Sequence, residues 1–348
     1  MSDNYDPLYS FRRPADGLPW FINLIITARC NLYCHSCASA SVNMPMPPKE
    51  KVLAFIDHLA EWLPTPRMVI VTGGEPLMHP NIMEFLERLS RHGFITTLNS
   101  NGSLLNVEKV EQLKRLDLRV LNLSLDGIGE LHDRLRNAPG LFQGVMDILY
   151  YMSHNTDFLI NAITQINAVN AYNLPDLVRY VTGKPKFRVF RFQAIVPTLS
   201  RPWTTDFFKE SHLWPRTDAE LTTVLKAMDE LEELREQGYP INNPHSQFEH
   251  WRRYFRDPFN FRGNQGCRVA YDNFQSMPDG TVNFCDKFPA LGTIEDDPKT
   301  LWESPEAEKM RKEMSRCTRP CNYTVNCCFL EEEGGCALTP SGENQDAE

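Results

Sequence analysis

The stretch Ala28-Arg29-Cys30-Asn31-Leu32-Tyr33-Cys34-His35-Ser36-Cys37 places three cysteines in a CxxxCxxC spacing directly after the apolar run 21–27. The run predicts a buried strand, and the cysteines then lie on the loop at its carboxyl end, where parallel-sheet folds place their chemistry. Three thiolates can hold three corners of a cubane cluster and leave its fourth iron open to a ligand. The alternative interpretation is a set of unrelated buried or zinc-binding cysteines.

Around this loop, short β-rich runs alternate with helical patterns between residues 21 and about 196. The predicted strands are 21–27, 68–72, 95–99, 120–125, 158–167 and 187–196, and the predicted helices are 49–62, 80–92, 106–116, 142–154 and 173–181. Repeated βα units build a parallel sheet covered by helices. The sequence therefore predicts an α/β fold, a partial (β/α)6 barrel similar to part of a TIM barrel.

The pattern changes after residue 201, which indicates a domain boundary. We expect an N-terminal extension over 1–20, the barrel over 21–200, a connecting helical segment over 201–262, a small cysteine-rich domain over 263–337 and a disordered acidic tail over 338–348. The connecting segment contains a charged helix over roughly 217–237 and aromatic residues from Phe248 to Phe261, which at helical spacing are more often core than pocket lining. Pro278-Asp279-Gly280 predicts a hairpin in the small domain.

Composition narrows the class of protein. The formal net charge of −9 disfavours a nucleic-acid partner, because such binding draws on clustered basic side chains. No apolar run approaches the roughly 18 residues that a membrane span needs, and the polar N-terminus lacks a signal-peptide layout, so we expect a cytoplasmic protein with no membrane partner. Ten cysteines in a reducing compartment then point to metal or iron–sulfur ligation and not to disulfides.

The stretch Thr72-Gly73-Gly74-Glu75-Pro76 ends the second predicted strand. Together with the CxxxCxxC loop it resembles the radical S-adenosylmethionine (SAM) superfamily, which pairs a three-cysteine loop with a GGEP motif. The resemblance implies that Cys30, Cys34 and Cys37 ligate a [4Fe–4S] cluster whose open iron chelates the amino and carboxylate groups of SAM. It also implies that Gly73, Gly74, Glu75 and Pro76 line the amino group, with the glycines letting the backbone approach the ligand.

Two further segments resemble SAM-contacting parts of the family. Asn99-Ser100-Asn101-Gly102 ends the third strand and Ser124-Leu125-Asp126-Gly127 ends the fourth. By resemblance, SAM would be contacted by Ser100, Asn101, Ser124 and Asp126, and Arg136 would meet its carboxylate. The alternative is that Asn101 and Asp126 only form turns and that the arginine lies on a solvated helix face. Ser36 stands where the family usually has an aromatic residue, which leaves the adenine seat open, with Tyr33 or His35 as substitutes.

The C-terminal cysteines resemble the SPASM and twitch domains that hold auxiliary [4Fe–4S] clusters. Cys267, Gly280 and Cys285 form C-x12-G-x4-C, and the remaining cysteines of this region are Cys317, Cys321, Cys327, Cys328 and Cys336. We expect one auxiliary cluster, ligated by Cys267, Cys285 and two of Cys317, Cys321 and Cys327. A second cluster that uses Cys328 and Cys336 is the competing arrangement, and one of these two could instead be a free thiol that gives a hydrogen atom to a substrate radical. Zinc is the alternative occupant of the domain.

The resemblance implies a radical SAM oxidoreductase- or lyase-type enzyme. The reduced cluster would cleave SAM to a 5′-deoxyadenosyl radical that abstracts a hydrogen atom from a substrate in the barrel. The expected cofactors are the SAM-binding cluster, SAM and an auxiliary cluster for electron transfer or substrate anchoring. The expected redox partner is an external one-electron donor such as flavodoxin or ferredoxin.

The length of the segment before Cys30 bears on the class of substrate. Only about 29 residues precede Cys30, too few for the peptide-recognition domain of many peptide-modifying relatives, so the expected substrate is a polar small molecule, sugar- or nucleoside-like. A maturase that modifies a ribosomal peptide or protein by oxidation, crosslinking or epimerisation is the alternative. A non-catalytic iron–sulfur or zinc-binding protein is a remote one, because it would not need the GGEP motif.

Overall fold

The computed structural model describes residues 16–182, 187–197, 205–259, 267, 269–317 and 319. Six parallel strands follow one another across its sheet: β1 (Phe21–Thr27), β2 (Met68–Gly73), β3 (Ile95–Ser100), β4 (Val120–Ser124), β5 (Leu159–Ile166) and β6 (Phe187–Ala194). Each lies within two residues of its predicted bounds at either end. The predicted α/β fold, a partial barrel, is confirmed.

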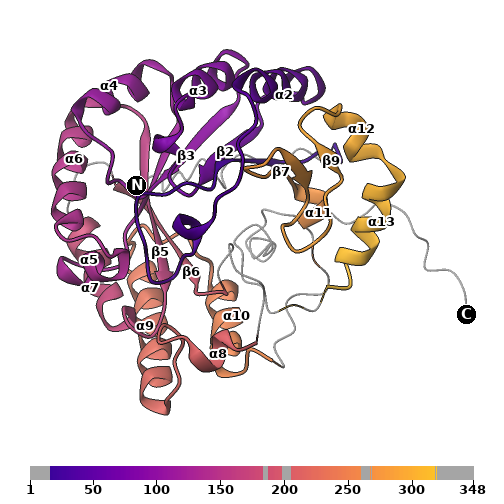
Figure 1. The fold of residues 1–348 in the computed structure, drawn as a ribbon. Coiled ribbons are helices and arrows are strands. Elements are labelled where there is room, and N and C mark those ends of the chain that lie inside the picture. The colour runs from indigo at the N-terminus through magenta and orange to yellow at the C-terminus, as the bar shows by residue number, and fades with distance from the viewer. Residues whose placement is uncertain are drawn as a thin grey trace, which may run out of the picture.

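Helices connect the strands and cover the outer side of the sheet (Figure 1). They are α2 (Lys49–Trp62), α3 (Ile82–Arg91), α4 (Val107–Arg115), α6 (Leu141–Asn155) and α7 (Leu174–Thr182), which confirm the five predicted helices, and the short α5 (Glu130–Arg136), which was not predicted. Within the described ranges there are also three 3₁₀ turns, η1 (Ser39–Ser41), η2 (Pro76–Met78) and η3 (Ala171–Asn173). Alternate strand residues such as Leu98, Leu121 and Ile160 are buried in one core with helix residues such as Phe85 and Leu149.

The C-terminal module extends the same sheet beyond β1. Strand β7 (Asn273–Ser276) pairs in parallel with β1, and β8 (Thr281–Asn283) and β9 (Gly292–Thr293) continue antiparallel. The hairpin between β7 and β8 lies where Pro278-Asp279-Gly280 predicted it. Helices α11 (Val269–Asp272), α12 (Pro298–Glu303) and α13 (Pro305–Met314) complete the module, with α12 in contact with α2 (Figure 1). The domain bounds stay a prediction, and the predicted tail 338–348 lies outside the described residues.

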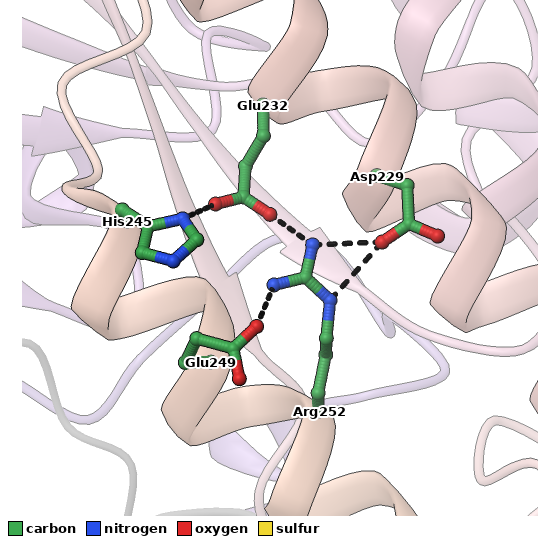
Figure 2. Close-up of polar contacts among 5 residues, drawn as sticks. All are labelled: Asp229, Glu232, His245, Glu249 and Arg252. Atoms are coloured by element: carbon green, nitrogen blue, oxygen red, sulfur yellow. Dashed lines mark hydrogen bonds and ion pairs between the residues drawn. The ribbon is translucent and has the colours of Figure 1, made fainter.

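The connecting segment contains α8 (Phe207–Glu210), α9 (Asp218–Glu236) and α10 (His245–Arg256). Figure 2 shows ion pairs that join α10 to α9: the guanidinium of Arg252 on α10 lies 2.8 Å from Asp229 Oδ1 and also pairs with Glu232, both on α9. The same guanidinium lies 2.6 Å from Glu249 Oε1 on α10 itself. Glu232 in turn contacts His245. Four aromatic residues of α10, Phe248, Trp251, Tyr254 and Phe255, are buried core, as the helical spacing favoured, whereas Phe259 beyond the helix is 55% exposed.

The outer edge of β6 is covered by residues 239–243, here called the edge strap. The N–H of Phe190 donates to Pro240 O at 2.7 Å, and the N–H of Asn242 donates back to Phe190 O at 3.0 Å. The Asn243 side chain then accepts from Phe192 N at 2.7 Å and donates to Phe192 O at 3.0 Å. The strap therefore satisfies backbone groups that β6 would otherwise leave open.

Candidate active site

The three N-terminal cysteines lie on the loop that follows β1, at the carboxyl edge of the sheet. The loop is held in place by the N–H of His35, which donates to Leu135 O at 3.0 Å, and by the N–H of Cys37, which donates to Cys34 O at 3.2 Å. Cys30 and Cys34 are partly buried and Cys37 is exposed. Burial raises the pKa of the Cys30 and Cys34 thiols, so their thiolates need positive charge or hydrogen bonds nearby.

Gly73 and Gly74 let the end of β2 lie directly against this loop. A Cβ atom on Gly73 would lie 2.3 Å from Thr27 O, and one on Gly74 would lie 2.2 Å from Arg29 O. Backbone hydrogen bonds join the same segments, from Gly74 N to Thr27 O at 2.9 Å and from Glu75 N to Arg29 O at 2.8 Å. The backbone at the end of β1 and in the cysteine loop thus fills the space that a side chain would need. This contact explains why glycine stands at both positions, whereas the sequence had suggested close approach to a ligand.

The carboxylate of Glu75 is fully buried and ties the end of β2 to the end of β3. It accepts hydrogen bonds from Leu77 N at 3.1 Å, Ser100 Oγ at 3.0 Å and Asn101 N at 2.8 Å. Burial raises the pKa of Glu75, while these donors and the more distant Arg136 favour its charged form. Pro76 follows as the first residue of η2. Glu75 thus organises the segment that carries two of the predicted SAM contacts, Ser100 and Asn101.

The side chain of Asn101 lies beside the cysteine loop. Its Nδ2 is 3.8 Å from Cys30 Sγ and donates to Asn31 Oδ1 at 3.1 Å. Its Oδ1 accepts from the N–H and the hydroxyl of Ser103 at 2.9 and 2.6 Å. Asn101 therefore does more than form the turn after β3, because its amide joins that turn to the cysteine loop.

Asp126 and Arg136, both predicted to contact SAM, form an ion pair with 2.6 Å between Oδ2 and Nη2. Asp126 also accepts from Gln165 N at 3.1 Å. Arg136 is mostly buried, and its Nη1 lies 4.0 Å from Cys34 Sγ. Burial alone would lower the pKa of Arg136, but Asp126 and Cys34 outweigh it and raise this pKa. The alternative of an arginine on a solvated helix face is therefore wrong for Arg136, whereas Arg134 is exposed.

His132 belongs to the same region. It is fully buried, and its Nδ1 accepts the N–H of Asp126 at 3.1 Å. Burial, reinforced by Arg136, lowers the pKa of His132 to about 4, so the ring is neutral near pH 7. The sequence motifs alone assign no role to this histidine. Ser124 itself ends β4 in a half-buried position.

Tyr33 and His35, the expected substitutes at the adenine seat, are both exposed. Tyr33 is 62% exposed, and the ring of His35 lies against His212, with 3.2 Å between Nδ1 of the former and Nε2 of the latter. Neither ring is packed into the site, so the adenine seat beside Ser36 stays a prediction.

The donor set fits a cubane cluster. Among the described residues, no three His, Cys, Asp or Glu side chains are grouped as a site for a single metal ion. A cubane does not require such convergence, because each thiolate binds a different iron. Three thiols on one short loop, two of them partly buried and one of these, Cys34, beside the cation Arg136, match that requirement. Cys30, Cys34 and Cys37 would hold the cluster, and Glu75, Ser100 and Asn101 would lie beside it.

A row of polar side chains crosses the inner face of the sheet. This amide row consists of Thr72, Asn99, Asn122 and Asn161, and each amide Nδ2 donates to the preceding member at 3.2, 2.8 and 3.2 Å. Asn161 is fully buried, and its Oδ1 makes no hydrogen bond within the described part of the chain. The row therefore ends in an acceptor that an N–H or O–H donor could satisfy.

Three of the predicted C-terminal ligands, Cys267, Cys285 and Cys317, are described, whereas Cys321, Cys327, Cys328 and Cys336 lie outside the described residues. Burial raises the pKa of Cys267, with a further contribution from Cys317. Burial, with contributions from Asp286 and Cys267, raises the pKa of Cys285 to about 12. The three thiols thus lie near enough to interact electrostatically, and their ligation of an auxiliary cluster stays a prediction.

Comparison with known proteins agrees with this geometry. Residues 24–167 match the family model described as Radical SAM superfamily. The AdoMet-dependent heme synthase of Methanosarcina barkeri is 36% identical over 130 residues, which cover 36% of this chain and 36% of the relative. The antilisterial bacteriocin subtilosin biosynthesis protein AlbA of Bacillus subtilis is 24% identical over 348 residues, which cover 94% of this chain and 69% of AlbA.

Among solved structures, Streptococcus suis SuiB bound to its precursor peptide SuiA has a TM-score of 0.63 at 16% identity, over 85% of this chain and 67% of SuiB. Together with the cysteine loop and the parallel sheet, the family match defines a radical SAM domain over residues 24–167, and the likeness to SuiB agrees with its fold. The cofactors of this family are a [4Fe–4S] cluster and SAM.

The chain spans between 31% and 47% of the length of the first four curated relatives. The helices in the described ranges are each too short or too polar to cross a bilayer.

Proposed function

We propose that this protein is a radical SAM enzyme that cleaves SAM reductively and abstracts a hydrogen atom from a peptide substrate held at the inner face of the barrel. The observation that carries the SAM chemistry is the CxxxCxxC loop packed on the GGEP segment, with Arg136 beside Cys34. When bound and reduced, the cluster supplies the electron that breaks a carbon–sulfur bond of SAM.

The chain's own residues would bind and orient SAM. The carboxylate of Glu75, which already accepts from Asn101 N, would accept a hydrogen bond from the amino group of SAM, and the buried cation Arg136 would pair with the carboxylate of SAM. The guanidinium of Arg136 would then bind two carboxylates, that of SAM and that of Asp126, which lies 2.6 Å away. Its Nε has no hydrogen-bond partner in the described residues. Ser100, Ser124 and Asp126 would supply polar contacts to the rest of the ligand.

Two observations favour a peptide over the polar small molecule expected from the sequence. The first is that AlbA, a bacteriocin biosynthesis protein, is similar to 94% of this chain, whereas the heme synthase is similar to 36% of it. In addition, strands β1 to β5 contain no charged residue, and their inner face carries the amide row. Side-chain amides match the donors and acceptors of peptide groups, whereas carboxylates or phosphates call for cationic partners.

The C-terminal module would hold one auxiliary [4Fe–4S] cluster, with Cys267, Cys285 and two of Cys317, Cys321 and Cys327 as ligands. Four thiolates leave no open iron, so this cluster would transfer electrons or support the structure and would not bind SAM. The proposal is supported by the burial of Cys267 and Cys285, which raises the pKa of both thiols, with smaller contributions from Cys317 to the first and from Cys267 to the second. An oxidation, crosslink or epimerisation of the peptide remains within this chemistry, and flavodoxin or ferredoxin would supply the external electron.

The experiment is anaerobic reconstitution with iron and sulfide, followed by reaction with dithionite and SAM. We expect 5′-deoxyadenosine from the wild-type protein and none from Cys30→Ala, with Tyr150→Ala on the exposed surface of α6 as the control. Absence of 5′-deoxyadenosine from a wild-type protein that holds iron would refute the proposed function.

The substrate class is tested with peptides encoded beside the gene. Mass spectrometry should detect a modified peptide, and Asn161→Leu should reduce its formation while 5′-deoxyadenosine still forms without substrate. Turnover of a small metabolite, with no peptide modified, would favour the alternative substrate instead.

A further inference from the structure

Each sulfur of the N-terminal cysteine loop lies beside an N–H group from a different part of the fold. The Asn101 amide Nδ2, at the end of β3, is 3.8 Å from Cys30 Sγ. The Arg136 guanidinium Nη1, on α5, is 4.0 Å from Cys34 Sγ. The backbone N–H of Ser39, in η1, is 3.4 Å from Cys37 Sγ. Two of these donors are side chains that family resemblance assigns to SAM.

Asn101 is fixed in this position by contacts on all sides. Its backbone N–H donates to the buried carboxylate of Glu75 at 2.8 Å, and its Oδ1 accepts from Ser103. With the oxygen occupied by two donors, the Nδ2 group must point the other way, toward Asn31 Oδ1 and Cys30 Sγ. The amide is therefore oriented by the protein before any ligand binds.

Arg136 is fixed by its pair with Asp126. Its Nη2 lies 2.6 Å from Asp126 Oδ2, and its Nη1 faces Cys34 Sγ. Asp126 is held in turn by Gln165 N at 3.1 Å and by its own N–H bond to His132. A buried guanidinium is always charged, so it places a fixed positive charge beside one cluster ligand.

We propose that Asn101 and Arg136 are positioning residues for the cluster, which donate N–H groups to the thiolates of Cys30 and Cys34 and thereby raise the reduction potential of the cluster. Hydrogen bonds to the sulfurs and the net charge of the site are main determinants of such potentials. An N–H donor and a nearby positive charge both favour the more negative, reduced state. This inference rests on the proposed function, since it assumes that these cysteines hold a [4Fe–4S] cluster.

The experiment is a redox titration of the reconstituted full-length protein without SAM, followed by electron paramagnetic resonance. The relevant signal is identified in a separate sample as the one that changes when SAM is added, which separates it from an auxiliary cluster. Asn101→Asp removes the N–H donor but keeps the oxygen that accepts from Ser103. Arg136→Gln removes the positive charge but keeps an amide N–H.

At the potential where half of the wild-type cluster is reduced, the ratio of reduced to oxidised cluster should fall about tenfold in each variant, which corresponds to a shift of about 59 mV for a one-electron couple. Ser103→Ala disturbs the surrounding network without removing an N–H group that faces sulfur, and it should titrate like the wild type. Loaded Asn101→Asp and Arg136→Gln proteins that also titrate like the wild type would overturn the proposal while leaving the proposed function intact.

For a variant that does not take up the cluster, the iron content of the reconstituted protein is measured instead of the reduction potential. Iron lost from Arg136→Gln but retained in Arg136→Lys and Ser103→Ala would support the proposal, because the charge then stabilises the Cys34 thiolate. Equal loss of iron from the Ser103→Ala control would count against it, because any disturbance of the network would then suffice. A wild-type protein without a SAM-responsive cluster would refute the proposed function and this inference together.

Discussion

Replacement of His132 by asparagine should flatten the dependence of stability on pH. His132 is fully buried with Nδ1 accepting the N–H of Asp126, and an asparagine Oδ1 can accept the same hydrogen bond. The variant therefore keeps the contact that shapes the loop after β4 and removes only the titrating ring. The change separates the proton-binding behaviour of His132 from its structural role.

The magnitude follows from the lowered pKa of His132, about 4 against an ordinary value of 6.5. Because the folded state holds the neutral ring, the stability that His132 contributes is fully present above pH 6.5 and is lost as the pH falls toward 4. Linkage between these values gives a loss of about 2 kcal/mol between pH 7 and pH 5. A histidine with an unperturbed pKa would give no such loss.

The assay is urea unfolding of the wild type and His132→Asn at pH 7 and pH 5, with both proteins in the same cluster state. Other titrating groups, cluster ligands included, cancel in the difference between the two proteins. His58→Asn, which removes an exposed imidazole on α2, is the matched control. A difference between wild type and His132→Asn that is the same at both pH values would refute the reasoning and mean that His132 is charged or solvated in the folded state.

Three further predictions concern the two cluster sites. Gly74→Ala should prevent cluster loading, measured as iron content, because its Cβ would lie 2.2 Å from Arg29 O. The control Gly144→Ala, in helix α6 with nothing within 4 Å of its Cβ, should load iron normally and raise the free energy of unfolding by about 1 kcal/mol, measured by thermal unfolding. Glu75→Gln should weaken SAM binding by about 1.5–3 kcal/mol, and unchanged affinity in titration calorimetry of the cluster-loaded variant would remove Glu75 from the site. The Cys30/Cys34/Cys37→Ala triple variant should retain about four irons per chain if one auxiliary cluster is present, about eight would require two, and zinc without iron would exclude an iron–sulfur domain.

The barrel was predictable because its strands are short apolar runs of a kind that parallel sheets bury on both faces. The same runs concealed the amide row. A single asparagine inside a strand such as Val120–Ser124 carries no information about its neighbours on other strands. Only the register, which sets Asn99 beside Asn122 and Asn122 beside Asn161, brings these side chains together.

The parallel pairing of β7 with β1 could not be predicted from the sequence for a related reason. The four residues of β7, Asn273–Ser276, show little apolar periodicity, and they pair with β1 across some 250 positions of the chain. The predicted SAM contacts Asp126 and Arg136 were identified by motif, but their pairing depends on the unpredicted helix α5. Likewise, the need for Gly74 follows from how closely β2 meets the cysteine loop, a distance that only the folded structure contains.

The edge strap over β6 has a consequence for solubility. A half-open barrel ends in strands whose backbone groups can recruit a strand from another molecule, which is a route to aggregation. In the described part of the chain, one end of the sheet is the two-residue β9 and the other is β6, whose N–H and C=O groups at Phe190 and Phe192 are already taken by residues 239–243. Replacing the strap by a glycine–serine linker would therefore uncover β6 and cause the protein to self-associate edge to edge.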